Sequence, residues 1–227
     1  DSGVSDSINV DRHTAIASRL TPTVVLRCGL EGEVAFRRQF GELLGALRSP
    51  RAMLALLASA VLIAINWFVY IWAIMAGEVY ATSIGYYLNP LVNVLLGTLV
   101  LGEKLSRRQW IAVAIAAVAV ALLAAGAVTS LWISLTLGFS FALYGLVRKQ
   151  VAVGSLPGLT IESAILLAPA IVIAWWYAAG PQGSSFGQDW WMSALIIFSG
   201  VVTAVPLLLF AIAARRMDYS ALGFIQY

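Results

Sequence analysis

The chain has 227 residues, of which 61% are hydrophobic and only 11% are charged. Charged residues make up about 25% of a soluble domain, so this composition excludes an ordinary soluble protein and indicates an all-α polytopic membrane protein. The formal net charge is +3, and the single cysteine excludes an intrachain disulfide and a cysteine-based metal site. We expect the lipid bilayer as a partner, and no cofactor, no metal and no nucleic acid.

Residues 1–50 differ from the remainder of the chain. They are rich in charged side chains and contain no apolar run long enough to cross a bilayer. We expect residues 1–33 to form a poorly ordered tail. The segment Gln39–Leu47 is expected to form a short amphipathic helix on the cytoplasmic surface. Residues 51–227 are then the transmembrane region.

After Arg51, long uncharged segments alternate with short polar ones. A helix needs about 20 apolar residues to cross the bilayer core. The uncharged run 109–147 is too long for one span and is divided at residues 125–130, and Gly154–Gly158 and Gly180–Asp189 are expected as loops. The six expected full spans are Ala52–Gly77, Ala81–Gly102, Gln109–Ala127, Leu131–Lys149, Leu159–Ala179 and Trp190–Ala214, and Tyr219–Tyr227 begins a seventh.

Lysine and arginine gather in every second connection. The alternate connections, around Glu78, at 125–130 and at 180–189, contain neither residue. Because basic loops remain cytoplasmic, we expect 48–51, 104–108, 148–149 and 215–216 to be cytoplasmic. For Arg148 and Lys149 this pattern favours a solvated helix end. An aromatic belt is expected at the opposite boundary, formed by Trp132, Trp175, Trp176, Tyr177, Trp190 and Trp191.

The segment Ala81–Gly102 carries a polar stripe. Tyr86, Asn89 and Asn93 lie on one helical face, and Pro90 removes one backbone hydrogen bond between them. Amides are unfavourable in hydrocarbon, so the stripe should face protein or water. Two interpretations stay open, hydrogen bonding between helices and the lining of a solute path, and we favour the second.

The sequence also contains a weak internal repeat. Residues Ser59–Asn66 resemble Ser199–Pro206, and the motif at Ser83–Tyr86 resembles that at Ala221–Phe224. The two copies are five helices apart, and an odd number of spans inverts the second copy. Inverted repeats of this kind are typical of secondary transporters.

Several motifs in a fixed order then resemble a known family, the RarD branch of the EamA-type drug/metabolite transporters. They are INWFVYIWAI (Ile65–Ile74), SIGYYLNPLVNVLLGTLVLGEKL (Ser83–Leu105), GFSFALYGLVRKQ (Gly138–Gln150), LTIES (Leu159–Ser163) and ALGFIQY (Ala221–Tyr227). The resemblance implies ten helices in two inverted five-helix repeats, in the bacterial inner membrane. The helices here would be the third to the ninth, so we expect this chain to be a fragment with an atypical N-terminus.

On this basis we expect one cavity lined by amide and aromatic side chains. The candidate substrate-binding residues are Asn66, Trp67, Tyr70, Tyr86, Asn89, Asn93, Tyr144 and Gln226. For Asn66, hydrogen bonding between helices is nearly as good an explanation, and for Trp67 the alternative is buried packing. Helix kinks are expected at Pro90, Pro169 and Pro206.

Glu162 is the one carboxylate inside an expected span. Intramembrane carboxylates are candidates for proton transfer, so Glu162 is a candidate for proton coupling. It also falls in the expected first turn of its helix, where a negative charge suits the helix dipole. Both interpretations stay open.

Together these features predict a secondary-active transporter, not an enzyme. It would export small metabolites or drug-like molecules by alternating access, with a small molecule and H+ as its partners. The alternatives are a membrane scaffold or sensor, in which the polar stripes would pack without a cavity, and a channel.

Overall fold

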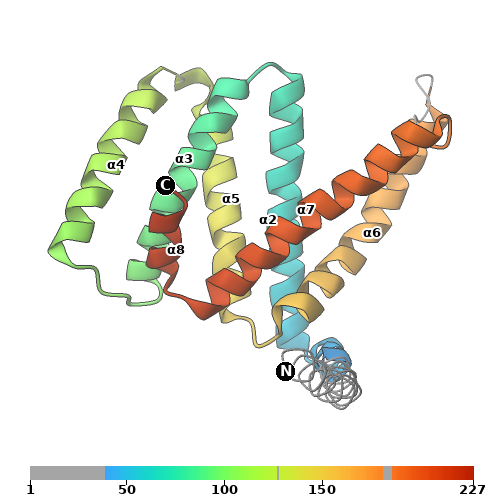
Figure 1. Ribbon diagram of the computed structural model, residues 1–227, viewed down its shortest axis with the longest axis horizontal. Helices are drawn as coiled ribbons and strands as arrows, with labels where there is room; N and C mark the ends of the chain where they lie inside the picture. Colours follow the sequence, from blue (N-terminus) through green and yellow to red (C-terminus); the bar gives the residue numbers. More distant parts are fainter. Residues whose placement is uncertain (1–38, 127, 181–185) are drawn as a thin grey trace, which may run out of the picture.

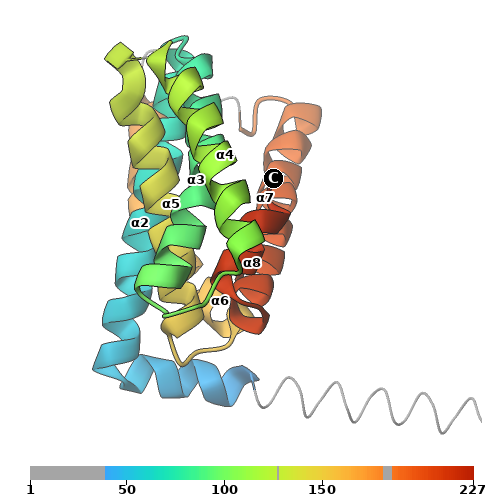
Figure 2. The same ribbon diagram turned by 90° about the vertical axis from the view of Figure 1, so that its left-hand side faces the viewer.

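The computed structural model describes residues 39–126, 128–180 and 186–227, and all regular secondary structure within these ranges is helical (Figure 1). The expected tail over residues 1–33 lies outside the described residues. A first helix covers residues 39–48, as the amphipathic pattern predicts, and Figure 2 shows it lying across one end of the bundle. The longer elements are α2 (Pro50–Met75), α3 (Val79–Leu99), α4 (Arg107–Ala125), the short η1 (Val128–Ser130), α5 (Leu131–Gln150), α6 (Ser155–Ala179), α7 (Trp190–Arg216) and α8 (Tyr219–Ile225).

The helix starts follow local capping chemistry. Ser49 caps α2 through a 3.4 Å hydrogen bond from the Ala52 N–H, and Pro50 occupies the first helical position. Ser106 and Gln109 form a reciprocal capping box at the start of α4. These caps satisfy backbone N–H groups that a helix start leaves without partners.

The expected loop at Gly154–Gly158 is wrong, because α6 already begins at Ser155. Pro157 falls in the first turn of α6, where a proline costs no intrahelical hydrogen bond. The earlier start also moves Glu162 into the third turn of α6. The interpretation of Glu162 as a first-turn charge at a helix end is therefore wrong.

α5 lies at the centre of the bundle and packs against α2 and α3, while α7 contacts its C-terminal half. α8 packs on α3, and α4 contacts α3 from the outside. α6 and α7 pack together and lean away from the other helices toward one end (Figure 1). The fold is thus a tight α2–α3–α5 group with a diverging α6–α7 pair.

The basic segments 48–51, 104–108, 148–149 and 215–216 all lie at one end of the bundle, which we call the basic end (Figure 1). The other end carries Trp132 at the start of α5, Trp175 and Trp176 at the end of α6, and Trp190 and Trp191 at the start of α7. All five indoles are at least half exposed. The side chain of Tyr177 lies outside what the structure describes.

Five of the described helices are long and apolar enough to cross a membrane, namely Pro50–Met75, Arg107–Ala125, Val128–Gln150, Ser155–Trp176 and Trp190–Arg216. α3 has 21 residues but is not among the five. Its two asparagines and three tyrosines lower its hydropathy below that of its neighbours. The chain is therefore a polytopic membrane protein whose least apolar long helix is packed between α5 and α8.

Candidate functional site

A cavity of about 310 Å³ lies between α2, α3 and α5, and we call it the amide cavity. Asn89 and Tyr86 reach it from α3 and Asn66 from α2. The Oδ1 atom of Asn89 is buried and has no hydrogen-bond partner among the described residues. The full lining is Asn66, Gly85, Tyr86, Asn89, Pro90, Leu137, Phe141 and Gln226.

A second cavity of about 310 Å³ shares the lining residues Asn66 and Tyr86 with the amide cavity. We call it the aromatic cavity, because Trp67, Tyr70 and Tyr86 line it together with Ile71 and Thr203. The rings of Tyr70 and Tyr86 meet edge to face, with centroids 5.8 Å apart. The two cavities together offer amide groups beside aromatic faces, an arrangement suited to small amphipathic molecules.

Two of the asparagines also join helices. Asn66 donates hydrogen bonds of 2.9 Å to the Leu137 carbonyl and to Ser140 Oγ on α5. Asn93 is fully buried beside the amide cavity and donates a 2.6 Å hydrogen bond to Gln226 Oε1. Asn66 therefore both lines the cavities and ties α2 to α5, while Asn93 connects α3 with the end of α8.

α8 packs closely against the face of α3 that carries the polar stripe. A Cβ atom on Gly223 would lie 2.7 Å from the Pro90 carbonyl oxygen, and one on Gly97 would lie 2.8 Å from the Ser220 nitrogen. These glycines let the two helices approach each other. Pro90, Pro169 and Pro206 all lie inside continuous helices, α3, α6 and α7 respectively.

A third cavity of about 370 Å³ lies between α2, α6 and α7, and we call it the side cavity. It shares Trp67 and Thr203 with the aromatic cavity, and Glu162 borders it at the α6 wall. The remaining lining residues are mostly apolar: Ile63, Ala64, Leu159, Ser163, Leu166, Ser199, Gly200, Ala204 and Leu207.

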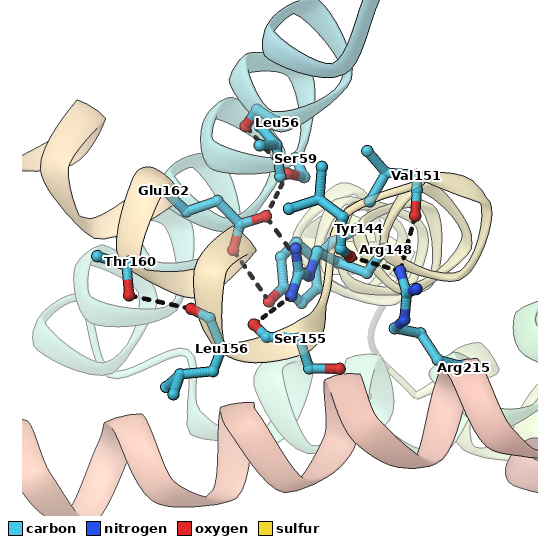
Figure 3. Close-up of polar contacts among 11 residues, drawn as sticks. Leu56, Ser59, Tyr144, Arg148, Val151, Ser155, Leu156, Thr160, Glu162 and Arg215 are labelled. Atoms are coloured by element: carbon cyan, nitrogen blue, oxygen red, sulfur yellow. Dashed lines mark hydrogen bonds and ion pairs between the residues drawn. The ribbon is translucent and has the colours of Figure 1, made fainter. Parts of the chain in front are cut away.

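Glu162 is buried in a cluster of polar groups from three helices (Figure 3). Ser59 of α2 donates a short hydrogen bond to Oε1, and the Tyr144 hydroxyl of α5 lies 3.5 Å from Oε2. The Arg148 guanidinium of α5 forms an ion pair in which Nε lies 3.6 Å from Oε1. Tyr144 therefore belongs to this cluster and not to the amide cavity, whose lining does not include it.

The expectation of a solvated end for Arg148 is wrong, because its side chain is 0% exposed. Nη2 donates a 2.7 Å hydrogen bond to the Ser155 carbonyl, while Nε and Nη1 have no hydrogen-bond partner among the described residues. The guanidinium lies directly against Gly158, where an added Cβ would be 2.8 Å from Cζ and would overlap Nη1. Gly158 thus makes the room that lets a charged side chain turn into the bundle.

The neighbouring basic residues also bind backbone carbonyls. Lys149 Nζ donates to the carbonyls of Ala214 and Met217, at 3.1 and 2.5 Å, and so caps the C-terminal end of α7. In return, Arg215 of α7 donates from Nη1 to the carbonyls of Val151 and Val153, at 2.7 and 2.6 Å. The α5–α6 connection and the end of α7 are therefore held together reciprocally.

Glu103, in the connection between α3 and α4, holds the start of α8. Its two carboxylate oxygens accept hydrogen bonds of 2.7 Å from the Tyr219 and Ser220 N–H groups. Burial alone would raise the pKa of Glu103, but the hydrogen bonds from Ser220 and Tyr219 and the nearby Lys149 charge outweigh burial and hold that pKa below its usual value. In the sequence, Glu103 directly precedes the basic segment 104–108, and that pattern gives no sign of its contact with α8.

Comparisons with known proteins all point to one family. The EamA-like transporter family matches residues 34–125. Protein RarD of Escherichia coli is 44% identical over 198 residues, which cover 84% of this chain and 64% of that protein. Protein RarD of Streptomyces exfoliatus is 42% identical over 190 residues, covering 84% of this chain and 60% of that protein. The chain thus spans about three-fifths of the length of these two relatives.

A protein of Vibrio cholerae, named as an uncharacterized transporter, is 37% identical over 227 residues, covering 99% of this chain and 72% of that protein. No solved structure matches the chain. The sequence motifs, the helical membrane architecture and these relatives agree. The chain belongs to the RarD branch of the EamA-like transporter superfamily.

Proposed function

We propose that the protein is a secondary-active transporter that exports small metabolites or drug-like molecules by alternating access. The observation that carries the proposal is the pair of amide and aromatic cavities, which share Asn66 and Tyr86 at the junction of α2 and α3. A scaffold or sensor would be expected to pack the polar stripes without a cavity. Amides beside aromatic rings suit amphipathic molecules with little net charge.

We further propose that α3 spans the bilayer with the five more apolar helices, within an inverted arrangement of two five-helix repeats. Support comes from the position of α3, which packs against α5 on one side and α8 on the other. Polar residues in a membrane helix are tolerated where they face protein or a water-filled cavity. Asn89 and Asn93 meet this condition, since one borders the amide cavity and the other is buried against the end of α8.

The transport proposal is tested by flux through the full-length protein in liposomes. A panel of small amphipathic and weakly charged molecules is loaded, and candidates are first selected by their ability to raise the thermal unfolding temperature. Ligands that bind the native state raise this temperature by mass action. We expect at least one stabilising ligand to cross parent liposomes faster than protein-free liposomes. Stabilising ligands that never cross would favour the sensor alternative.

We propose that the basic end faces the cytoplasm in the bacterial inner membrane. Single cysteines replacing Arg108, Gln150 and Gln188 test this in a Cys28→Ala background. The first two lie at the basic end and the third at the tryptophan-rich end, and all three positions are exposed. An impermeant maleimide is expected to label only the Gln188 position in intact spheroplasts. Labelling of the other two before the cells are broken would contradict the proposed orientation.

We also propose that Glu162 couples transport to protons. Glu162 is buried within α6 and borders the side cavity, which shares Trp67 and Thr203 with the aromatic cavity proposed to bind the solute. Glu162→Gln is then expected to abolish flux driven by a pH gradient while still allowing exchange of substrate across the membrane. Equal pH dependence in the variant and the parent protein would exclude this role.

A further inference from the structure

The hydrogen bonds that hold α6 and α7 to the rest of the described chain gather at the basic end. Glu162 of α6 is bound by Ser59 and Tyr144, Arg148 binds the start of α6, and Arg215 of α7 binds the α5–α6 connection. Toward the tryptophan-rich end, α6 and α7 lean away from the bundle (Figure 1). The structure is therefore closed by specific polar contacts at one end, beside the side cavity.

From this geometry we infer that Ser59, Tyr144, Arg148 and Glu162 form a latch that closes the basic end in one state of the transport cycle and separates in the other. The inference rests on the proposed alternating access and names the contacts that control it. The latch joins α2, α5 and α6 through a single carboxylate, whose two oxygens are shared among three donors (Figure 3). Loss of that carboxylate as a common acceptor would release α6 from α2 and α5, which remain joined to each other through Asn66.

The incomplete hydrogen bonding of Arg148 supports the inference that its contact with Glu162 can break. A guanidinium carries five N–H donors. Among the described residues, however, the buried Arg148 side chain makes one hydrogen bond, to the Ser155 carbonyl, and its ion pair with Glu162 is longer than a hydrogen bond. Buried donors without acceptors cost free energy. The closed arrangement therefore leaves Nε and Nη1 of Arg148 without hydrogen-bond acceptors among the described residues. A modest movement of α6 would break contacts that are already incomplete.

Gly158 provides a way to test the latch without changing any charge. Its Cα lies against the guanidinium, so the methyl group of Gly158→Ala would overlap Arg148 and displace its side chain from the buried position beside Glu162. Gly45→Ala is the matched control, because Gly45 lies on the helix over residues 39–48 at the same end and an added Cβ there meets nothing within 4 Å.

The readout is the distance between spin labels on cysteines replacing Arg51 of α2 and Thr160 of α6, both exposed. The labels are placed in the full-length protein with Cys28→Ala, and distances are measured by pulsed electron spin resonance in liposomes. We expect one short distance in the parent and in Gly45→Ala. In Gly158→Ala, a longer distance is expected to rise from a minor state, about 0.1–10% populated in two-state proteins, to the majority.

A double-mutant comparison makes the test specific. Arg148→Gln should also populate the longer distance, and adding Gly158→Ala to it should give no further change, because the side chain that the methyl group displaces is already gone. If Gly158→Ala yields no folded protein, Ser59→Ala, which removes one donor to Glu162, should by itself populate the longer distance. An unchanged distance in the folded variants, or effects that simply add, would overturn the latch. Because no substrate is involved, this failure is distinct from a failure to transport.

Discussion

Replacing Asn89 with leucine is expected to reduce transport at least tenfold while leaving the amount of folded protein close to that of the parent. The Oδ1 atom of Asn89 has no partner among the described residues and borders the amide cavity, so its removal breaks no hydrogen bond of the described fold at that atom. A tenfold loss corresponds to about 1.4 kcal/mol, the size of one good hydrogen bond to a solute. The measurement is flux in liposomes, normalised to folded protein.

Asn93→Leu should behave differently although it lies one helical turn away. Asn93 is fully buried and donates to Gln226, so its replacement should destabilise the packing of α3 with the end of α8 by about 1 kcal/mol. Leu95→Val, at a side chain 40% exposed on the outside of α3, is the control and should change neither quantity. If Asn89→Leu lost folded protein in step with activity, Asn89 would be a packing residue as well.

Most of the long helices, and the helical face that carries Tyr86 and Asn89, could be predicted from the sequence for definite physical reasons. Uncharged runs of about 20 residues form helices in a bilayer because no other structure satisfies the backbone there. Residues spaced by three or four positions share a face, which brought Tyr86 and Asn89 together from sequence alone. Asn66 and Tyr70 are one turn apart on the adjacent helix with Trp67 beside them, and the structure places Asn66 at both cavities but Trp67 and Tyr70 only at the aromatic cavity.

The charged contacts could not be predicted in the same way. Ser59 lies 103 positions before Glu162 along the chain, and helical spacing carries no information about such pairs. The positive-inside rule counts basic residues at helix ends but does not say whether a side chain points outward. The direction of Arg148 depends on the absence of a side chain at Gly158, ten residues further on. The same limit applies to Glu103, whose partners Tyr219 and Ser220 lie more than a hundred residues away.

Arg148→Leu is expected to produce the largest loss of stability, about 3–5 kcal/mol, because it leaves the Glu162 carboxylate buried without its counter-charge. The same substitution at Arg108, which is exposed at the same end, should change stability by no more than about 0.5 kcal/mol. The free energy of unfolding is measured by titration with denaturant in mixed micelles. Equal effects at the two positions would mean that Arg148 is solvated after all.

The double variant Arg148→Leu with Glu162→Leu separates the cost of an unpaired charge from the value of the pair. Removing both charges together leaves no buried ion, and replacing a buried ion pair with apolar residues is often neutral or stabilising. The double variant should therefore be more stable than Arg148→Leu alone, although Ser59 and Tyr144 then lose their common acceptor. If the double variant is also unable to close the basic end, the Arg148–Glu162 ion pair serves the conformational change and not stability.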